Sequence, residues 1–142
     1  LAIKFYYDGV KYRLKESKRV KELLTKVIRK YSKMHGDLNY IFTDDNTLLE
    51  INRKFLNHDY YTDVITFDYS DIFKIKGEIY ISIDTVRDNS INYKVSLRDE
   101  VIRILVHGTL HLCGLDDATN ELREAMSREE NVWIKKFKEG VS

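Results

Sequence analysis

The amino-acid sequence predicts a single α+β domain, in which a mixed sheet of about four or five strands packs with about five helices. Short β-branched and aromatic runs alternate with longer segments whose apolar residues recur every three or four positions. One of these longer segments is apolar on nearly every side, which predicts a central buried helix. The length of 142 residues fits one domain, expected over residues 1–142, whose core needs no cross-link.

The chain opens with a predicted strand over residues 3–7, which are rich in aromatic and β-branched side chains. Asp8 and Gly9 are a turn signal, so we expect this strand to pair with residues 11–14. A hairpin is therefore the expected start of the fold.

A basic amphipathic helix is predicted over residues 18–33, with Ser17 as its N-cap and Gly36 ending it through a positive φ. The apolar residues that form its buried stripe are Val20, Leu23, Leu24, Val27, Ile28 and Tyr31.

The segment from Lys11 to Lys33 holds ten basic and two acidic residues, although the net charge of the whole chain is only +1. Such a block can bind the phosphates of a nucleic acid. The ordinary alternative is a solvated helix face. The candidate RNA contacts are Lys18, Lys21, Lys26, Arg29 and Lys30.

The middle of the chain predicts a strand over residues 38–43 and then a helix, capped by Asp44 or Asp45, that extends to about Leu56. The residues expected to face inward from this helix are Leu48, Leu49, Ile51 and Phe55.

Two strands and three helices are predicted in the remainder. The strands cover residues 64–69 and 78–83, and a short helix covers residues 84–93. Ser96 is the expected N-cap of the central helix over residues 97–113. The last helix begins after Thr119, and its expected inward residues are Leu122, Ala125, Met126, Val132, Trp133 and Phe137.

The central helix carries a motif with the spacing of a metal site. His107 and His111 are four residues apart, so their imidazoles share one face of the helix and can bind one cation. Gly114 allows the chain to turn back through a left-handed conformation. Asp117 then offers a third ligand, and Asp116 is its rival if the turn is drawn differently.

The alternative is that both histidines are core residues satisfied by hydrogen bonds. Two imidazoles on so apolar a helix would then need two separate buried partners. Three protein ligands instead leave a fourth position for water, whose pKa a bound Zn²⁺ lowers from 15.7 to about 7. One divalent ion is therefore expected, with zinc as the first choice and Fe(II) or Mn(II) as alternatives.

The motif resembles the signature of the YbeY family of endoribonucleases, His-Gly-x-Leu-His-Leu-x-Gly-x-Asp-His. The matching residues are His107, Gly108, Leu110, His111, Leu112, Gly114 and Asp116. Further stretches similar to the family are residues 49–52 with Phe55, residues 62–64, residues 66–67 and residues 77–82. The resemblance implies a metal-dependent endoribonuclease, specific for single strands, that matures ribosomal RNA and works with ribosomes in a bacterium.

The sequence departs from the family pattern at two positions. The third metal position is Asp117 instead of His, and a less acidic bound water is expected than in a three-His site. Leu56 stands at the position where the family has an Arg. His58, two residues further on, would partly take the place of that Arg. Arg53, His58 and Asp63 are candidates for orienting groups or for proton transfer.

Other observations limit the function classes. Cys113 is the only cysteine, so no disulfide forms within the chain, and we expect a cytoplasmic protein with no signal peptide and no membrane partner.

Gly108 stands where a metallopeptidase helix carries its general base, which disfavours a peptidase. A non-enzymatic RNA- or ribosome-binding factor with a structural metal stays open as an alternative. Tyr60 and Tyr61 could stack on bases or pack internally.

Overall fold

The sheet has four strands in the order β1-β2-β4-β3 in the computed structural model, which describes residues 2–31 and 33–140. The elements are β1 (Ile3–Tyr7), α1 (Ser17–Lys30), β2 (Met34–Thr43), α2 (Asp45–Leu56), β3 (Val64–Asp68), β4 (Lys74–Ser82), α3 (Ile83–Asn92), α4 (Leu97–Leu112) and α5 (Asn120–Lys138). The α+β fold class predicted from the sequence is confirmed.

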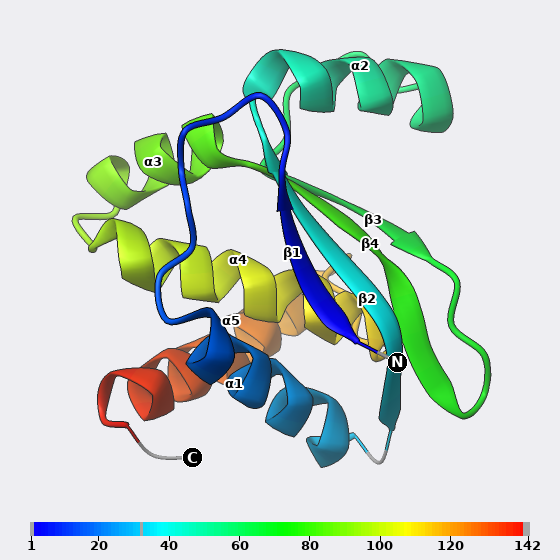
Figure 1. The fold of residues 1–142 in the computed structure, drawn as a ribbon, viewed down its shortest axis with the longest axis vertical. Helices are drawn as coiled ribbons and strands as arrows, with labels where there is room; N and C mark the ends of the chain where they lie inside the picture. Colours follow the sequence, from blue (N-terminus) through cyan, green and yellow to red (C-terminus); the bar gives the residue numbers. More distant parts are fainter. Residues whose placement is uncertain (1, 32, 141–142) are drawn as a thin grey trace.

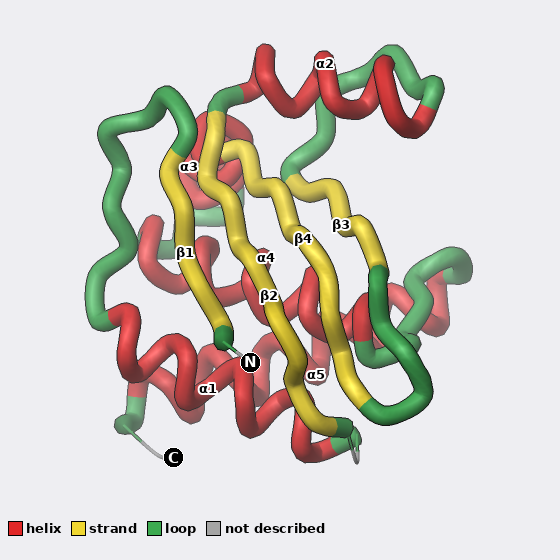
Figure 2. The backbone as a smooth tube through the Cα atoms, turned by 45° about the vertical axis from the view of Figure 1, so that its right-hand side comes forward, coloured by secondary structure: helices red, strands yellow, loops and turns green. Residues whose placement is uncertain are grey.

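Three strands of the sheet are parallel and one edge strand is antiparallel. β1 pairs with β2 and β2 with β4 in parallel, whereas β3 pairs with β4 in the antiparallel direction. Helices α1, α3, α4 and α5 lie on one face of the sheet, and α2 crosses one end of it (Figures 1 and 2). The helix-covered face therefore holds the main core.

Helix α4 is the centre of this core, as predicted. It contacts α1, α3 and α5 and also reaches β3 and β4. Gly108 brings it close to the sheet, because a Cβ atom there would lie 3.0 Å from Ile79 Cγ2, tighter than an ordinary contact. The helix is thus fixed on all sides, and the side chains it carries are held in a rigid frame.

The predicted helix caps at three positions are confirmed. The side chain of Asp44 accepts a hydrogen bond from Thr47 N, and Ser96 accepts one from Asp99 N. Thr119 accepts one from the backbone of the first turn of α5. These caps are local, so the sequence alone is enough to place them.

The predicted hairpin at the start of the chain is wrong. β1 pairs with β2 in parallel, and residues 11–14 form no strand. Val10, Tyr12 and Leu14 instead pack against the core from a loop, and Leu14 N donates to Tyr7 Oη at 3.0 Å. Alternate apolar residues in a covering loop give the same pattern as a strand.

The predicted ends of α1 also differ from the structure. Glu16, with a φ of 56°, occupies the N-cap position without a side-chain cap, and Ser17 is already helical. The helix ends at Lys30, and Gly36 lies in β2 without a positive φ. A Cβ atom at Gly36 would collide with the Lys76 side chain, so this glycine serves the approach of two strands.

The inward faces of two helices need correction. In α2, Phe55 is 60% exposed and Asn52 is buried, where its Nδ2 donates to Tyr60 O at 2.9 Å. In α5 the buried residues are Met126, Glu130, Trp133, Ile134 and Phe137, whereas Leu122, Ala125 and Val132 are exposed. The prediction is therefore confirmed for Met126, Trp133 and Phe137, and it missed the buried Glu130 because it considered apolar side chains alone.

No helix among the described residues has the length and apolar character needed to cross a bilayer.

Candidate metal centre

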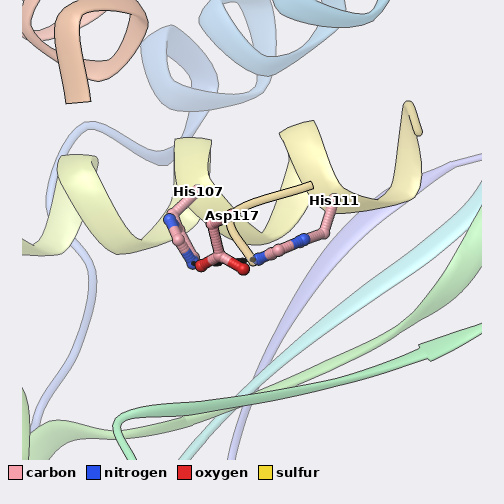
Figure 3. Close-up of side chains that lie close together, drawn as sticks. All are labelled: His107, His111 and Asp117. Carbon is pink, nitrogen blue, oxygen red and sulfur yellow. Dashed lines mark hydrogen bonds and ion pairs between the residues drawn. The ribbon is translucent and has the colours of Figure 1, made fainter. Parts of the chain in front are cut away.

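The side chains of His107, His111 and Asp117 converge on one point beside α4 (Figure 3). The two Nε2 atoms of the histidines are 3.1 Å apart. Asp117 Oδ2 lies 3.6 Å from Nε2 of His107 and 3.5 Å from Nε2 of His111. The structure thus brings together the three residues that the motif singles out.

The loop after α4 explains why the carboxylate is Asp117 and not Asp116. Gly114 adopts a φ of 99°, and Leu115 N then donates back to Leu110 O at 3.0 Å. Asp116 Oδ1 accepts a hydrogen bond from Ala118 N at 3.0 Å, which closes a local turn. The side chain of Asp116 is therefore occupied by the turn, and that of Asp117 faces the histidines.

Hydrogen bonds at the far side of each ring determine which nitrogen carries the hydrogen. Nδ1 of His111 is 3.1 Å from the Leu115 carbonyl oxygen, which can only accept, so Nδ1 donates. Nδ1 of His107 is 2.7 Å from Glu130 Oε2 and donates to that carboxylate. Each neutral ring therefore presents a bare Nε2 lone pair toward the other ring and toward Asp117.

While both rings are neutral, three acceptor atoms face one another without a hydrogen to share, which is an unfavourable arrangement unless a proton or a metal cation lies between them. Ligands bound tetrahedrally at 2.0–2.1 Å are roughly 3.3–3.4 Å apart. The observed separations of 3.1, 3.5 and 3.6 Å agree with this spacing. The donor set of two imidazoles and one carboxylate fits a divalent ion such as Zn²⁺, Fe(II) or Mn(II).

Glu130 supports the site from α5 and was missed by the sequence analysis. It is 5% exposed, and besides His107 it accepts a hydrogen bond from Arg103 Nη1 at 3.2 Å. A carboxylate behind a ligating imidazole fixes the ring and increases its basicity. The signal in the sequence is an acidic residue in phase with the buried positions Met126 and Trp133.

The charges around His107 control its protonation. Burial by itself lowers the pKa of His107, but the hydrogen bond and charge of Glu130, with the charges of Asp63 and Asp117, raise that pKa above its ordinary value. The same carboxylates that favour a proton on the ring also favour a metal cation beside it.

Asp63 lies beside the metal cluster, the group formed by His107, His111 and Asp117. It precedes β3 and lines a cavity of about 150 Å³ together with His107, Arg103 and Glu100. Burial raises the pKa of the Asp63 carboxyl, against the opposing effect of His107. Glu100 is 3% exposed, burial raises its pKa, and its Oε1 is 3.5 Å from Arg103 Nε.

The other candidates for orientation or proton transfer lie apart from this cavity. Arg53 forms an ion pair with Asp59. His58 stacks on Tyr60 at a ring-centroid distance of 5.1 Å, and the two side chains are hydrogen-bonded. Leu56 is 38% exposed at the end of α2. These residues belong to α2 and its following loop and line neither of the two cavities that contain His107.

The basic residues of α1 are also separate from the metal cluster. None of them lines the two cavities that contain His107. Lys30 forms an ion pair with Glu129 at 2.7 Å, and Lys26 is half-buried. The exposed members of the group are Lys18, Lys21, Arg29 and Lys30.

Known proteins similar to this chain carry one consistent name. The sequence model of the family described as Endoribonuclease YbeY matches residues 7–138. The protein named Endoribonuclease YbeY of Parabacteroides distasonis is 42% identical over 131 residues, covering 92% of both chains. The protein of that name from Bacteroides thetaiotaomicron is 40% identical, covering 92% of this chain and 96% of its own.

A solved structure shows the same fold. The solution structure of TM1509 from Thermotoga maritima matches with a TM-score of 0.65 and 25% identity, covering 96% of this chain and 89% of that one. The matched residues of the family include the whole His107–Asp117 cluster. Its sequence, its fold and this arrangement of side chains show that the chain belongs to the YbeY family of endoribonucleases.

Proposed function

We propose that this protein is a zinc-dependent endoribonuclease that cleaves single-stranded RNA during ribosomal RNA maturation, in contact with the ribosome in the cytoplasm. The observation that carries the metal-dependent part is the convergence of two Nε2 lone pairs and Asp117 Oδ2 within 3.6 Å. The family supports RNA as the substrate. A sequence whose only cysteine is Cys113 fits a reducing compartment.

His107, His111 and Asp117 would hold the ion, which when bound supplies positive charge to a phosphoryl oxygen and acidity to water. Glu130 would keep the His107 ring oriented through its 2.7 Å hydrogen bond. Cavities on two sides of His107 keep the cluster accessible to a substrate. The protein thereby supplies a fixed electrostatic site for the charge that develops on a phosphodiester during cleavage.

Asp63 is the proposed proton acceptor. It shares a cavity with His107, and burial raises the pKa of its carboxyl, which favours its taking up a proton from a substrate hydroxyl. When the 2′-hydroxyl is the nucleophile, its proton passes to Asp63, the O2′–P bond forms and the P–O5′ bond breaks. The leaving O5′ takes up a proton from water, Asp63 returns its proton to the solvent, and the products carry a 2′,3′-cyclic phosphate and a 5′-hydroxyl.

The outer residues are proposed to bind the rest of the RNA. Arg53 and His58, with the exposed Tyr60 and Tyr61, form a polar and aromatic surface beyond α2 that suits backbone and base contacts. The basic residues of α1 would bind phosphates more distant from the cleavage point.

The test combines metal analysis of the purified protein with cleavage of a single-stranded RNA. Wild type is expected to contain about one zinc ion and to cut the RNA. His111→Ala and Asp117→Ala are expected to lose the metal and the cleavage while remaining folded. Asp116→Asn is the matched control, because its amide oxygen can still accept the turn hydrogen bond from Ala118 N while the carboxylate charge is lost.

Equal cleavage by all four folded proteins would refute a catalytic metal. RNA binding by metal-loaded wild type with no cleavage would instead favour a non-enzymatic RNA-binding factor. Casein hydrolysis that depends on His111 would favour a peptidase.

A further inference from the structure

A second hollow lies beside the metal cluster, between α4 and the first turns of α5. Its volume is about 160 Å³, and it is lined by His107, Asp117, Arg123, Met126, Ser127 and Glu130. Its lining includes His107 and Asp117, two of the three residues of the metal cluster, and Glu130, which hydrogen-bonds to His107. Any group bound here therefore lies next to that cluster.

The two acidic residues of this hollow already have partners. Oε1 of Glu130 accepts from Arg103, and its Oε2 accepts from His107. Oδ2 of Asp117 lies 3.5–3.6 Å from the two histidine Nε2 atoms. Their charges are therefore balanced within the protein once an ion occupies the cluster.

Arg123 is the permanently charged cation of the hollow, and its side chain is positioned. Its Nη1 donates to the main-chain carbonyl oxygen of Asp117 at 3.3 Å, and its Nη2 donates to Asn120 Oδ1. A guanidinium has five N–H groups, so several remain available for a ligand. Arg123 is also exposed, which leaves these groups accessible to a ligand from solution.

We propose that this hollow is a phosphate subsite for the RNA strand and that Arg123 is its binding cation. A planar guanidinium fork matches two oxygens of a phosphate, and the residues lining this hollow include no Phe, Tyr or Trp ring on which a base could stack. The subsite rests on the proposed function, because it places the strand next to the metal cluster.

The contact with the Asp117 carbonyl gives the subsite a further consequence. The same loop residue that supplies a carboxylate to the cluster also holds the phosphate-binding cation. The distance between the bound phosphate and the cluster is therefore fixed by one short piece of chain, and Arg123 acts on the position of the strand as well as on its affinity.

The experiment measures binding of the zinc-loaded protein to a fluorescent single-stranded RNA with 2′-O-methyl groups, over a series of salt concentrations. A gel run afterwards checks that the RNA is intact. Arg123→Ala is expected to weaken binding about tenfold at low salt. It is expected to reduce the slope of log affinity against log salt by about 0.7, the value for one phosphate contact on a single strand.

Two further variants separate this role from a structural one. Arg123→Lys keeps the charge without the fork, so it is expected to keep the salt slope and recover part of the affinity. Arg128→Ala removes another exposed arginine of α5 that lies outside the hollow, and it is expected to leave both quantities unchanged. Zinc content is expected to equal that of wild type in all three variants.

An Arg123→Ala protein with the wild-type affinity and slope overturns the subsite, as does a loss of affinity with no change in slope. A wild-type protein that binds RNA but does not cut an unmodified strand refutes the proposed nuclease, while the comparison of slopes still decides the subsite.

Discussion

Single residues decide the chemistry of this protein, and Glu130 shows it most clearly. The metal cluster is visible in the sequence as a motif, but the carboxylate that orients His107 lies 23 residues away on another helix. Its two oxygens connect the metal cluster to Arg103 and so join α4 to α5. The affinity of the cluster for a metal ion is therefore expected to depend on a contact between two helices.

Replacing Glu130 tests this dependence. Glu130→Gln is expected to lower the affinity for zinc by about 10- to 100-fold, because the His107 ring loses the charged acceptor that orients it. Competition with a fluorescent chelator measures the effect. Glu129→Gln is the matched control, since Glu129 pairs with Lys30 and Trp133 and not with the cluster. Similar affinities for Glu130→Gln and wild type would contradict the supporting role.

The protonation of His107 predicts how metal binding depends on pH. Burial lowers its pKa, but Glu130, Asp63 and Asp117 together raise it above the ordinary value of about 6.5. A proton then competes with the metal at a higher pH than at an ordinary histidine, so zinc affinity is expected to fall as the pH drops through this raised pKa. Chelator titrations between about pH 5 and pH 8 measure the midpoint. A midpoint below the ordinary histidine pKa would contradict the prediction.

The elements contribute by fixing where the ligands meet. Helix α4 presents both imidazoles from one face, and it is held by contacts on the sheet and three helices. The loop that follows supplies the third side chain, and its path depends on the left-handed conformation of Gly114. The helix supplies two of the side chains of the cluster, and a turn that glycine allows supplies the third.

Replacing Gly114 separates these contributions. At a φ of 99°, an alanine is expected to cost about 1–2 kcal/mol of stability and to displace Asp117 from the histidines. Gly114→Ala is therefore expected to lower both the unfolding free energy and the zinc affinity, measured by urea denaturation and chelator competition. Gly9→Ala is the control, because Gly9 also has a positive φ but is distant from the cluster in the chain. If both variants keep wild-type zinc affinity, the turn does not position the third ligand.

In the whole molecule, the basic residues of α1 lie apart from the cavities beside His107. They line neither cavity, whereas Asp63 lines one and Arg123 lines the other. A short RNA that occupies the metal cluster would therefore not need α1, and a long RNA could reach it. We therefore propose that the basic residues of α1 act in binding long substrates rather than in the cleavage step.

This separation predicts different effects on long and short substrates. A double variant, Lys21→Gln with Arg29→Gln, is expected to weaken binding of a long RNA and to flatten its salt dependence. Its cleavage of a short oligonucleotide is expected to stay at the wild-type rate. The control combines Lys94→Gln with Lys135→Gln, two exposed lysines outside α1. Equal long-RNA binding by the two double variants would favour a merely solvated helix face for α1.

The sequence by itself determined the fold class, the central helix, the N-caps of three helices and the two histidines that meet at the cluster. These features depend on residues close together in the chain, such as Ser96 with Asp99 or His107 with His111. The choice between Asp116 and Asp117 was left open by the motif and is decided by the turn that Asp116 itself closes.

Only the tertiary structure decided the parallel pairing of β1 with β2, the inward phase of α5 and the approach of Glu130, Asp63 and Arg123 to the cluster. Each of these depends on partners that are far apart in the sequence. A covering loop has the same local pattern as a strand, and the phase of Glu130 with buried positions does not identify its partner. In both cases a partner distant in the sequence compensates the free-energy cost of the position.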